Sequence, residues 1–400
     1  MKAATKKKQK KWLRFRHRVV CALLRVILGP YIRLTYGLKP ERFRQQGKRA
    51  YLVLMNHQTA FDQFFVGLSF RGPMYYLATE DLFSNGWVSS LIRFLAAPIP
   101  IRKQTTDINA VMSCIRVARE GGTIVIAPEG NRTYSGKTVY MSDAIAGLVK
   151  KLKLPVALFR IEGGYGVQPR WADKNRRGKM RAYVSQVIEP EEYGQMSNEE
   201  LFARIQTGLY VNEAVADGIF KSSKRAEYLE RVLYVCPKCG LSEFHSHGAA
   251  VRCKQCGLTV TYGEDKTFSG DVPFQFVNDW YQYQESYING LDVTQLSQKP
   301  IWQDTARFSR VEVYKKKHCL NPNAQVSLYG DRVVIDEMEI PFRDVGVITV
   351  LGRNKLNIYY GKEIYQLKGS KRFNALKYVH ISCRYKNLVK GDPNAEFLGL

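Results

Sequence analysis

Short apolar runs alternate with helical segments between residues 50 and 220, and this alternation constrains the fold more than any other feature of the 400-residue chain. Strand-like runs cover residues 51–55, 74–78, 123–127, 156–161 and 181–187. Helical periodicity between them covers residues 64–70, 87–94, 107–120 and 142–151. Alternating strands and helices are typical of an α/β layered domain, whose functional side chains lie on loops that leave the strand ends.

A histidine and an aspartate, His57 and Asp62, follow the first of these runs. Asp62 is five positions after His57, beyond the reach of neighbours on a regular helix, so we expect His57 in a loop and Asp62 in the first helical turn. A carboxylate that holds one ring nitrogen leaves the other available as a general base. The only other histidine in the first 230 residues is His17, in a cationic tail. A buried histidine that is hydrogen-bonded to a carboxylate also occurs in proteins without catalysis. This pair alone therefore does not decide between a catalytic role and a structural one.

A second polar segment, Ala-Pro-Glu-Gly-Asn-Arg at residues 127–132, follows the third strand-like run. The guanidinium of Arg132 offers paired donors that match phosphate oxygens, Gly130 allows close approach of the backbone, and Asn131 can add a donor. Glu129 is expected to hold an arginine or a substrate hydroxyl in position. Arg102, which ends the run Pro-Ile-Pro-Ile-Arg at 98–102, is a further expected phosphate ligand, with a surface arginine as the alternative.

These segments together resemble the glycerolipid acyltransferases of the PlsC type, the 1-acyl-glycerol-3-phosphate acyltransferases. Four blocks occur in the family's order: His57 and Asp62 in the H-x-x-x-x-D block, residues 98–102, residues 129–132, and an apolar stretch around a proline at 154–158. The third block usually reads E-G-T-R, and here Asn131 replaces threonine. The resemblance covers roughly residues 45 to 190. It implies transfer of a fatty acyl group from acyl-ACP or acyl-CoA to 1-acyl-glycerol-3-phosphate, forming phosphatidic acid. His57 and Asp62 would be catalytic, and Arg102, Glu129, Gly130, Asn131 and Arg132 would bind the substrate phosphate.

The N-terminal segment, residues 1–48, is basic and is expected to associate with a membrane. Residues 1 to 36 hold eleven Lys or Arg and no Asp or Glu. A helix over residues 12–28 would carry an apolar stripe opposite a basic one: Trp12, Phe15, Val19, Leu23 and Val26 against Arg14, Arg18 and Arg25. Such a helix suits the interface of an anionic membrane, and its alternative role is to cap the protein's own core. Because no uninterrupted apolar run reaches about 18 residues, we expect a peripheral or monotopic protein on the cytoplasmic face of the cell membrane.

Two C-x-x-C pairs predict a zinc ribbon at residues 231–265. Cys236 and Cys239 are followed, after thirteen residues, by Cys253 and Cys256, and a glycine follows each pair. Four thiolates make a closed tetrahedral site, so the expected Zn²⁺ is structural. This use of cysteine indicates a reducing compartment. The two histidines between the pairs, His245 and His247, are alternative ligands but are expected to be exposed loop residues.

The last part of the chain is β-rich. We expect an acyltransferase-like α/β domain at 49–222, helical from 199, then the ribbon, a helical linker at 266–310 and a β-rich domain at 311–400. Strand-like runs at 324–328, 332–336, 345–351, 355–360 and 363–367, and then a helix, resemble the layout of a pleckstrin-homology or GRAM-like barrel. An unrelated β-domain that serves as an assembly surface is the alternative.

The net charge of +25, from 61 Lys and Arg against 36 Asp and Glu, favours an anionic partner. An anionic membrane surface, the acyl donor and lysophosphatidic acid are the expected partners. Two other readings stay open: another acceptor, either glycerol-3-phosphate or a different lysophospholipid, and a zinc-ribbon protein that binds nucleic acid. The charge is concentrated on the N-terminal helix, and the ribbon has no evident aromatic and basic strand, so no specific nucleic acid is expected.

Overall fold

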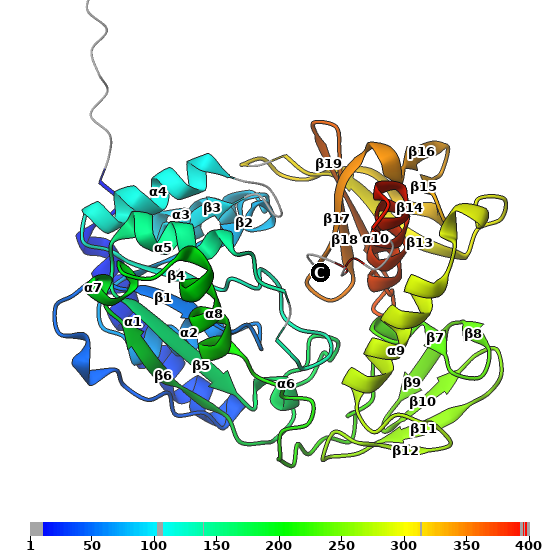
Figure 1. Ribbon diagram of the computed structural model, residues 1–400, viewed down its shortest axis with the longest axis horizontal. Coiled ribbons are helices and arrows are strands. Elements are labelled where there is room, and N and C mark those ends of the chain that lie inside the picture. Colours follow the sequence, from blue (N-terminus) through cyan, green and yellow to red (C-terminus); the bar gives the residue numbers. More distant parts are fainter. Residues whose placement is uncertain are drawn as a thin grey trace, which may run out of the picture.

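The computed structural model describes residues 11–101, 107–138, 140–312, 314–392, 395 and 397. They form an α/β lobe, from Phe15 to Leu209, and a C-terminal half, from Leu229 to Lys390 (Figure 1). The C-terminal half consists of a small cysteine-containing sheet, a long helix and a larger curled sheet. The mixed α/β architecture expected from the sequence is confirmed.

The α/β lobe is built on a six-stranded sheet with the strand order β3-β2-β4-β1-β5-β6. The strands are β1 (Leu52–Met55), β2 (Met74–Thr79), β3 (Ile99–Ile101), β4 (Thr123–Ile126), β5 (Val156–Glu162) and β6 (Arg181–Ile188). All neighbours are parallel except β5 and β6. Every residue of β1 and β4 is buried, as expected for central strands covered on both faces.

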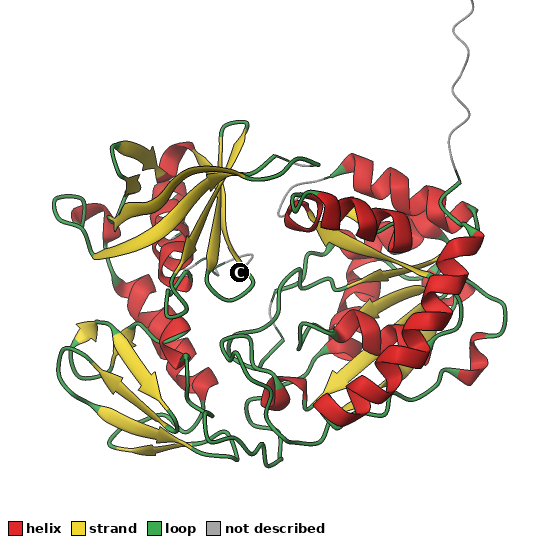
Figure 2. Ribbon diagram, turned by 180° about the vertical axis from the view of Figure 1, so that it is seen from behind, coloured by secondary structure: helices red, strands yellow, loops and turns green. Residues whose placement is uncertain are grey.

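Helices cover both faces of this sheet (Figure 2). Leu52 and Leu54 of β1 point to the side of α4 (Ile108–Arg119), α5 (Ala144–Leu152) and α8 (Asn198–Leu209). Val53 and Met55 point to the side of α1 (Phe15–Tyr36) and α2 (Asp62–Ser69). The remaining helices of the lobe are short or peripheral: η1 (Arg44–Gln46), η2 (Glu80–Phe83), α3 (Trp87–Ala96), α6 (Gly164–Val167) and α7 (Pro190–Tyr193).

The N-terminal helix differs from its predicted extent. It begins at Phe15, continues through Pro30 and ends at Tyr36, where Gly37 adopts φ +61°. A Cβ at Gly37 would lie 2.7 Å from the carbonyl oxygen of Gly178, so this helix end requires glycine. In the described part of the chain, α1 is the one helix long and apolar enough to cross a membrane, and 11% of its most apolar window is buried. The sequence did not predict an apolar helix of this length, because Arg25 and Arg33 interrupt the apolar run without ending the helix.

The predicted two-sided character of this helix is partly wrong. Trp12 precedes the helix and packs edge-on against Tyr75, with ring centroids 6.3 Å apart, instead of joining the apolar stripe. Arg25 faces the protein: its guanidinium donates to the carbonyl oxygens of Gly67, Phe70 and Gly72, at the end of α2, over 2.7–2.9 Å. Arg25 therefore caps a helix of the lobe, while the apolar stripe remains exposed.

The C-terminal half begins with the cysteine-containing part. It holds η3 (Leu229–Arg231), a two-stranded pair of β7 (Val235–Cys236) and β8 (Gly240–Leu241), and an antiparallel sheet in the order β12-β11-β10-β9. Those four strands are β9 (Phe244–His247), β10 (Ala250–Cys253), β11 (Thr259–Tyr262) and β12 (Phe268–Gly270). Helix α9 (Val277–Gly290) and η4 (Val293–Gln295) lead to the larger sheet.

The larger sheet has seven antiparallel strands in the order β16-β15-β14-β13-β19-β18-β17 and is curled like a half-barrel (Figures 1 and 2). The strands are β13 (Trp302–Arg310), β14 (His318–Leu328), β15 (Arg332–Ile335), β16 (Met338–Pro341), β17 (Val345–Leu351), β18 (Lys355–Tyr360) and β19 (Glu363–Gly369), with η5 (Phe342–Asp344) between two of them. The final helix α10 (Leu376–Lys390) packs against β17 and α9. The expected β-rich region with a C-terminal helix is confirmed.

Two expectations about this region are wrong. The helix that starts at Asn198 ends at Leu209, and the chain up to Leu229 contains only turns and isolated bridges, because its apolar residues pack singly against other elements. The expected helical linker at 266–310 contains the strand β13, which is the centre of the large sheet. Trp302, Ala306 and Phe308 are buried at alternate positions, a strand signal that the charged residues between them obscure.

The C-terminal half shares one hydrophobic core, and that core extends into the α/β lobe. Tyr134 and Trp171, from loops of the α/β lobe, belong to the same buried cluster as the small sheet, α9 and the large sheet. The Trp171 ring meets that of Tyr262 at a centroid distance of 5.8 Å. The C-terminal half is therefore packed against the loops that follow β4 and β5.

Candidate active site

The parallel pairing of β1 and β4 brings two polar loops together at their carboxyl ends. Leu54 pairs with Ile126, so the loop that starts at Asn56 lies beside the loop that starts at Ala127. The backbone N–H of His57 donates to Glu129 Oε1 over 2.9 Å. Asn56 fixes the same loop to β5, because its side-chain amide exchanges two 2.8 Å hydrogen bonds with the backbone of Ile161. The segments singled out in the sequence thus meet at one edge of the sheet.

His57 and Asp62 lie within hydrogen-bond distance, with His57 Nδ1 2.7 Å from Asp62 Oδ2. His57 is in the loop after β1 and Asp62 is in the first turn of α2, so their expected placement is confirmed. The Asp62 side chain is fully buried, whereas 24% of the His57 side chain is exposed. The imidazole is therefore the part of the pair that a substrate can reach.

The Asp62 carboxylate is held by its own loop. It accepts hydrogen bonds from the backbone N–H groups of Gln58 and Thr59 and from the Thr59 hydroxyl, at 2.7–3.0 Å. Four donors, counting His57, converge on this carboxylate and fix its position. An ionised Asp62 accepts a proton-bearing Nδ1, so the ring nitrogen Nε2 of His57 carries the free lone pair.

Gly130, Asn131 and Arg132 form the turn after Glu129. Gly130 has φ +69°, a conformation that a residue with a Cβ rarely adopts. The Nη1 atom of Arg132 is enclosed and has no hydrogen-bond partner among the described residues. Burial, together with the positive charges of Arg170 and Arg353, lowers the pKa of Arg132 to about 10. An enclosed, unpaired guanidinium nitrogen beside other cations can donate to an anion.

The remaining expected phosphate ligand, Arg102, lies outside the described residues. It follows β3, the edge strand of the sheet, which β2 and β4 separate from β1. The fourth block, 154–158, leads into β5, whose residues Val156, Ala157 and Leu158 are fully buried. That block therefore contributes to the hydrophobic core of the α/β lobe.

Arg170, in a glycine- and aromatic-rich stretch at residues 163–171, is central to the loops around the site. Arg170 is 2% exposed, and its guanidinium lies over the ring of Tyr134, 4.1 Å from the ring centroid. Its Nη1 donates to the carbonyl oxygen of Arg132 over 2.8 Å. Its Nη2 donates to Val350 of β17 over 3.1 Å. An arginine in a run of glycines and aromatics carries no local signal for such a role, since its partners are far away in the sequence.

One family model matches the part of the chain that contains the loops after β1 and β4. Residues 38–161 match the model of the family described as Acyltransferase. This part of the chain is an acyltransferase domain. The match contains β1, β4, His57, Asp62 and the turn at Arg132, and it ends before the cysteine cluster and the seven-stranded sheet.

The acyltransferase domain also resembles individual proteins. The chain is 20% identical over 136 residues to the 1-acyl-sn-glycerol-3-phosphate acyltransferase of Bacillus subtilis (strain 168). That similarity covers 34% of this chain and 65% of the Bacillus protein. Among solved structures, the 1-acyl-sn-glycerophosphate acyltransferase PlsC of Thermotoga maritima matches 50% of this chain and 81% of its own, with a TM-score of 0.41 and 20% identity.

Outside the acyltransferase domain, four cysteines form a cluster that could hold a metal ion. The sulfur atoms of Cys236, Cys239, Cys253 and Cys256 all lie within 4.8 Å of one another. Two of the Sγ–Sγ distances are 3.6 Å, close to the roughly 3.8 Å between ligands of a tetrahedral site with metal–sulfur bonds of about 2.3 Å. Both histidines between the pairs are exposed, as expected, but they lie on strand β9 and not in a loop. The donor set is therefore the four thiolates.

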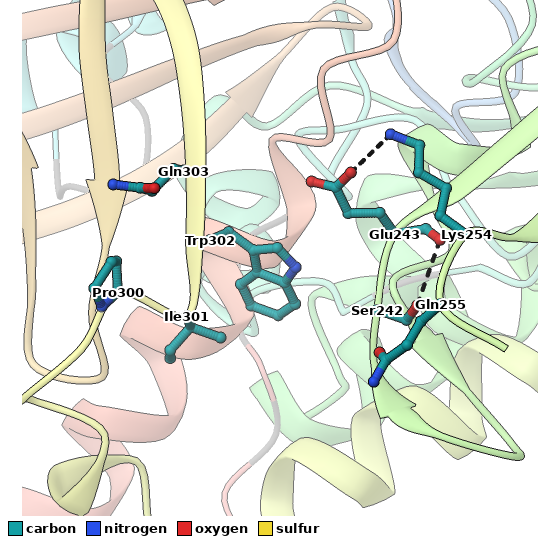
Figure 3. Close-up of a pocket in the computed structure, with 8 residues that line it drawn as sticks. All are labelled: Ser242, Glu243, Lys254, Gln255, Pro300, Ile301, Trp302 and Gln303. Carbon is teal, nitrogen blue, oxygen red and sulfur yellow. Dashed lines mark hydrogen bonds and ion pairs between the residues drawn. The ribbon is translucent and has the colours of Figure 1, made fainter.

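A surface cavity lies away from the acyltransferase domain, between the small cysteine-containing sheet and β13 (Figure 3). It has a volume of about 510 Å³ and is lined by Ser242, Glu243, Lys254, Gln255, Pro300, Ile301, Trp302 and Gln303. Its two charged side chains pair with each other, with Lys254 Nζ 2.7 Å from Glu243 Oε2. None of the residues predicted for catalysis or phosphate binding lines this cavity.

Proposed function

We propose that this protein transfers a fatty acyl group from acyl-ACP or acyl-CoA to the free hydroxyl of 1-acyl-glycerol-3-phosphate and thereby forms phosphatidic acid. The observation that carries this proposal is the 2.7 Å contact between His57 Nδ1 and Asp62 Oδ2, beside the turn that holds Arg132. A poised base next to an anion site suits a hydroxyl on a phosphorylated molecule. The curated relative named for this reaction supports the choice of acceptor.

In the proposed reaction His57 is the general base. Its Nε2 accepts the proton of the acceptor hydroxyl while the oxygen attacks the carbonyl carbon of the thioester. Asp62 keeps the other proton on Nδ1 and stabilises the imidazolium that forms. When the carbon–sulfur bond breaks, the imidazolium returns its proton to the leaving thiolate. The acceptor hydroxyl is itself the nucleophile, so no covalent intermediate with the protein is required.

The phosphate of the acceptor binds at the turn of residues 130–132. The enclosed Nη1 of Arg132 supplies a charge-assisted donor, and Asn131 can donate through its amide. The carboxylate of Glu129 accepts the backbone N–H of His57. In this proposal Glu129 aligns the loop that carries the base with the turn that binds phosphate.

Association with a membrane is proposed from the exposed face of α1. Eight large apolar side chains of this helix are exposed: Phe15, Val19, Leu23, Leu24, Val26, Ile27, Tyr31 and Leu34. Helix α3 adds Trp87, Val88, Leu91 and Phe94, and the two helices touch where Arg16 Nε donates to the Phe94 carbonyl over 2.8 Å. Such a patch indicates an interaction surface, and a lipid interface matches the acyl substrates.

The helix α1 would lie on the membrane instead of crossing it. Its other side is fixed to the lobe by Arg25 and by the buried side chains of Ile32 and Tyr36. The rings of Tyr31 and Tyr36 lie 5.9 Å and 5.3 Å from that of Phe61, which directly precedes Asp62. Lipid at the exposed face would therefore be next to the loop of the catalytic pair. We place the protein on the cytoplasmic face, where thioester donors and reduced cysteines occur.

For the cysteine cluster we propose Zn²⁺ with a structural role. Four sulfur ligands leave no open position for substrate. Cys236 and Cys253 are also part of the hydrophobic core of the C-terminal half, so the metal would stabilise the packing of that half.

The experiment that tests the proposal measures acyl transfer from defined thioesters to lysophosphatidic acid on anionic vesicles. We expect phosphatidic acid from the wild-type protein and a loss of at least about 100-fold in kcat for His57→Ala, the lower range for removal of a general base. The control is His245→Ala, at an exposed histidine of the small sheet. Turnover with glycerol-3-phosphate or another lysophospholipid in place of lysophosphatidic acid would change the acceptor and keep the reaction class. Full activity of His57→Ala would refute the mechanism.

A further inference from the structure

A turn of the large C-terminal sheet lies against the proposed phosphate site. The hairpin between β17 and β18 contains Gly352, Arg353 and Asn354. Arg170 joins this hairpin to the site, because one guanidinium donates both to the carbonyl oxygen of Arg132 and to that of Val350. A third, longer contact runs from Arg170 Nε to the carbonyl oxygen of Gly352, at 3.4 Å. Each of the three guanidinium nitrogens of Arg170 donates to one of these carbonyls, so Arg170 fixes the distance between the two segments.

Arg353 carries the positive charge at the tip of this hairpin. Its Nη1 lies 3.5 Å from Asp173 Oδ1, and 31% of its side chain is exposed. Its Nε is enclosed and has no hydrogen-bond partner in the described part of the chain. Asp173 is a weak counter-ion for Arg353, because the same oxygen accepts Arg231 Nη1 over the shorter distance of 2.7 Å.

The cations around the site exceed the anions. Four arginines, Arg132, Arg170, Arg231 and Arg353, lie here near three carboxylates. Asp173 pairs with Arg231 and Arg353, Asp62 is engaged by His57 and its own loop, and Glu129 accepts the backbone N–H of His57. Burial lowers the pKa of Arg353, and the charge of Arg231 acts in the same direction. Arg353 in turn lowers the pKa of Arg132. A cluster of arginines with one shared carboxylate is stabilised when a multiply charged anion binds between them.

We propose that Arg353 of the C-terminal sheet binds the phosphate of the acceptor together with Arg132 of the acyltransferase domain. Arg132 Nη1 and Arg353 Nε are two donors without a hydrogen-bond partner among the described residues. Two guanidiniums match a phosphate monoester, which has three terminal oxygens and two negative charges. The nature of the acceptor rests on the function proposed above, and the anion site itself does not.

This assignment gives the C-terminal half a function in the reaction. The sheet completes the substrate site of the α/β lobe, and its position is fixed by contacts on two sides. On one side are Arg170 and Asp173. On the other, Asp81 of η2 pairs with Lys317 and, over 3.4 Å, with Lys355 Nζ at the start of β18. A lysophospholipid with a head group on its phosphate would offer fewer terminal oxygens to the two arginines, so we expect a preference for the phosphomonoester.

The test compares Arg353→Gln with Arg343→Gln in the full-length protein. Arg343 belongs to the same half, and its side chain is 72% exposed, so it controls for the loss of one positive charge. Binding of glycerol 3-phosphate is measured by titration calorimetry, and acyl transfer is measured with lysophosphatidic acid. For Arg353→Gln we expect at least tenfold weaker binding and a similar rise in the KM for the acceptor. The KM for the donor should stay unchanged, and Arg353→Lys should restore part of the affinity.

A measurement on the wild-type protein covers the case in which Arg353→Gln does not fold. Glycerol 3-phosphate should protect Arg353, and not Arg343, from modification by phenylglyoxal, read by peptide mass spectrometry. Equal binding by the two glutamine variants, or no protection of Arg353, would overturn the inference. Binding that depends on Arg353 without acyl transfer from any thioester would instead overturn the proposed function and leave the anion site standing.

Discussion

The replacement of Asp62 by asparagine tests the catalytic geometry most directly, because it keeps the shape of the side chain and removes its charge. Asp62 Oδ2 faces His57 Nδ1 and the N–H of Gln58, while Oδ1 faces the N–H and hydroxyl of Thr59. An asparagine can place its NH₂ group on either side. Each orientation damages a different property of the base.

If the NH₂ group takes the place of Oδ2, it donates to Nδ1 of His57 and moves the ring proton to Nε2, where the base must be free. That change of tautomer costs about 10⁴ in kcat in hydrolases that use a similar pair. If the NH₂ group takes the place of Oδ1, the tautomer is kept but the imidazolium loses its counter-ion. Two unit charges about 4 Å apart at an effective dielectric constant of about 20 interact by about 4 kcal/mol, which corresponds to about 10³ in rate.

Both orientations therefore predict a fall in kcat of at least about 10³ for Asp62→Asn. The loss of one charge-assisted hydrogen bond should also lower the free energy of unfolding of the α/β lobe by about 1.5–3 kcal/mol. For a lobe of about 200 residues this is a decrease in Tm of about 3–12 °C. The assay is acyl transfer at saturating substrates, with thermal unfolding recorded on the same samples.

The matched control is Asp107→Asn. Asp107 also begins a helix, and its carboxylate accepts the backbone N–H of Ala110 over 3.1 Å. Asparagine is an equally good residue at this capping position, so kcat and Tm should stay close to the wild-type values. A folded Asp62→Asn protein with kcat within tenfold of the wild type would refute the assignment of His57 and Asp62 as a catalytic pair.

Three further changes test the other parts of the proposal. Arg132→Gln should raise the KM for the acceptor by about 10- to 150-fold, which corresponds to the loss of one hydrogen bond to a charged group, with little effect on the KM for the donor. In steady-state kinetics with each substrate varied in turn, equal changes in the two KM values would show that Arg132 does not bind phosphate. Leu23→Asp should weaken binding to anionic vesicles by at least about tenfold in a flotation assay, because burial of one leucine contributes about 1.5–3 kcal/mol. The control is Val389→Asp, at an exposed aliphatic residue of α10, which should leave vesicle binding unchanged. Gently purified protein should contain one zinc ion per chain. Chelation or Cys253→Ser should release that ion and lower the Tm of the C-terminal half. Metal analysis that finds no zinc would contradict the prediction of a zinc ribbon.

Much of the α/β lobe could be predicted from the sequence because its signals are local. The expected strand at 74–78 is β2, and the expected helix at 107–120 is α4, which Asp107 caps through the N–H of Ala110. The large sheet was predicted less completely. The strands β13 and β16 were missed, since β13 has charged residues between its buried ones and β16 has only four residues.

The same distinction holds for the candidate site. The spacing of His57 and Asp62 predicted a loop and a first helical turn, and the structure has both. The position of Glu129 beside His57 depends on which strands are neighbours, and only the sheet order decides that. The contacts that Arg170 and Arg353 make around the site were not predicted, because nothing near either residue in the sequence indicates the loop that it contacts.

Short-range geometry along the chain was enough to predict the histidine and aspartate five positions apart, the paired cysteines with their following glycines, and the alternation of strands and helices. Long-range packing was needed to show that the apolar face of α1 is exposed while Arg25 is turned inward, and that the C-terminal sheet lies against the turn that holds Arg132. The contact between Arg170 and Val350 joins residues 180 positions apart. Such contacts form because the hydrophobic core of the C-terminal half includes Tyr134 and Trp171 of the α/β lobe. Burial of this shared apolar surface fixes where the two halves meet. No periodic pattern in the sequence indicates that surface.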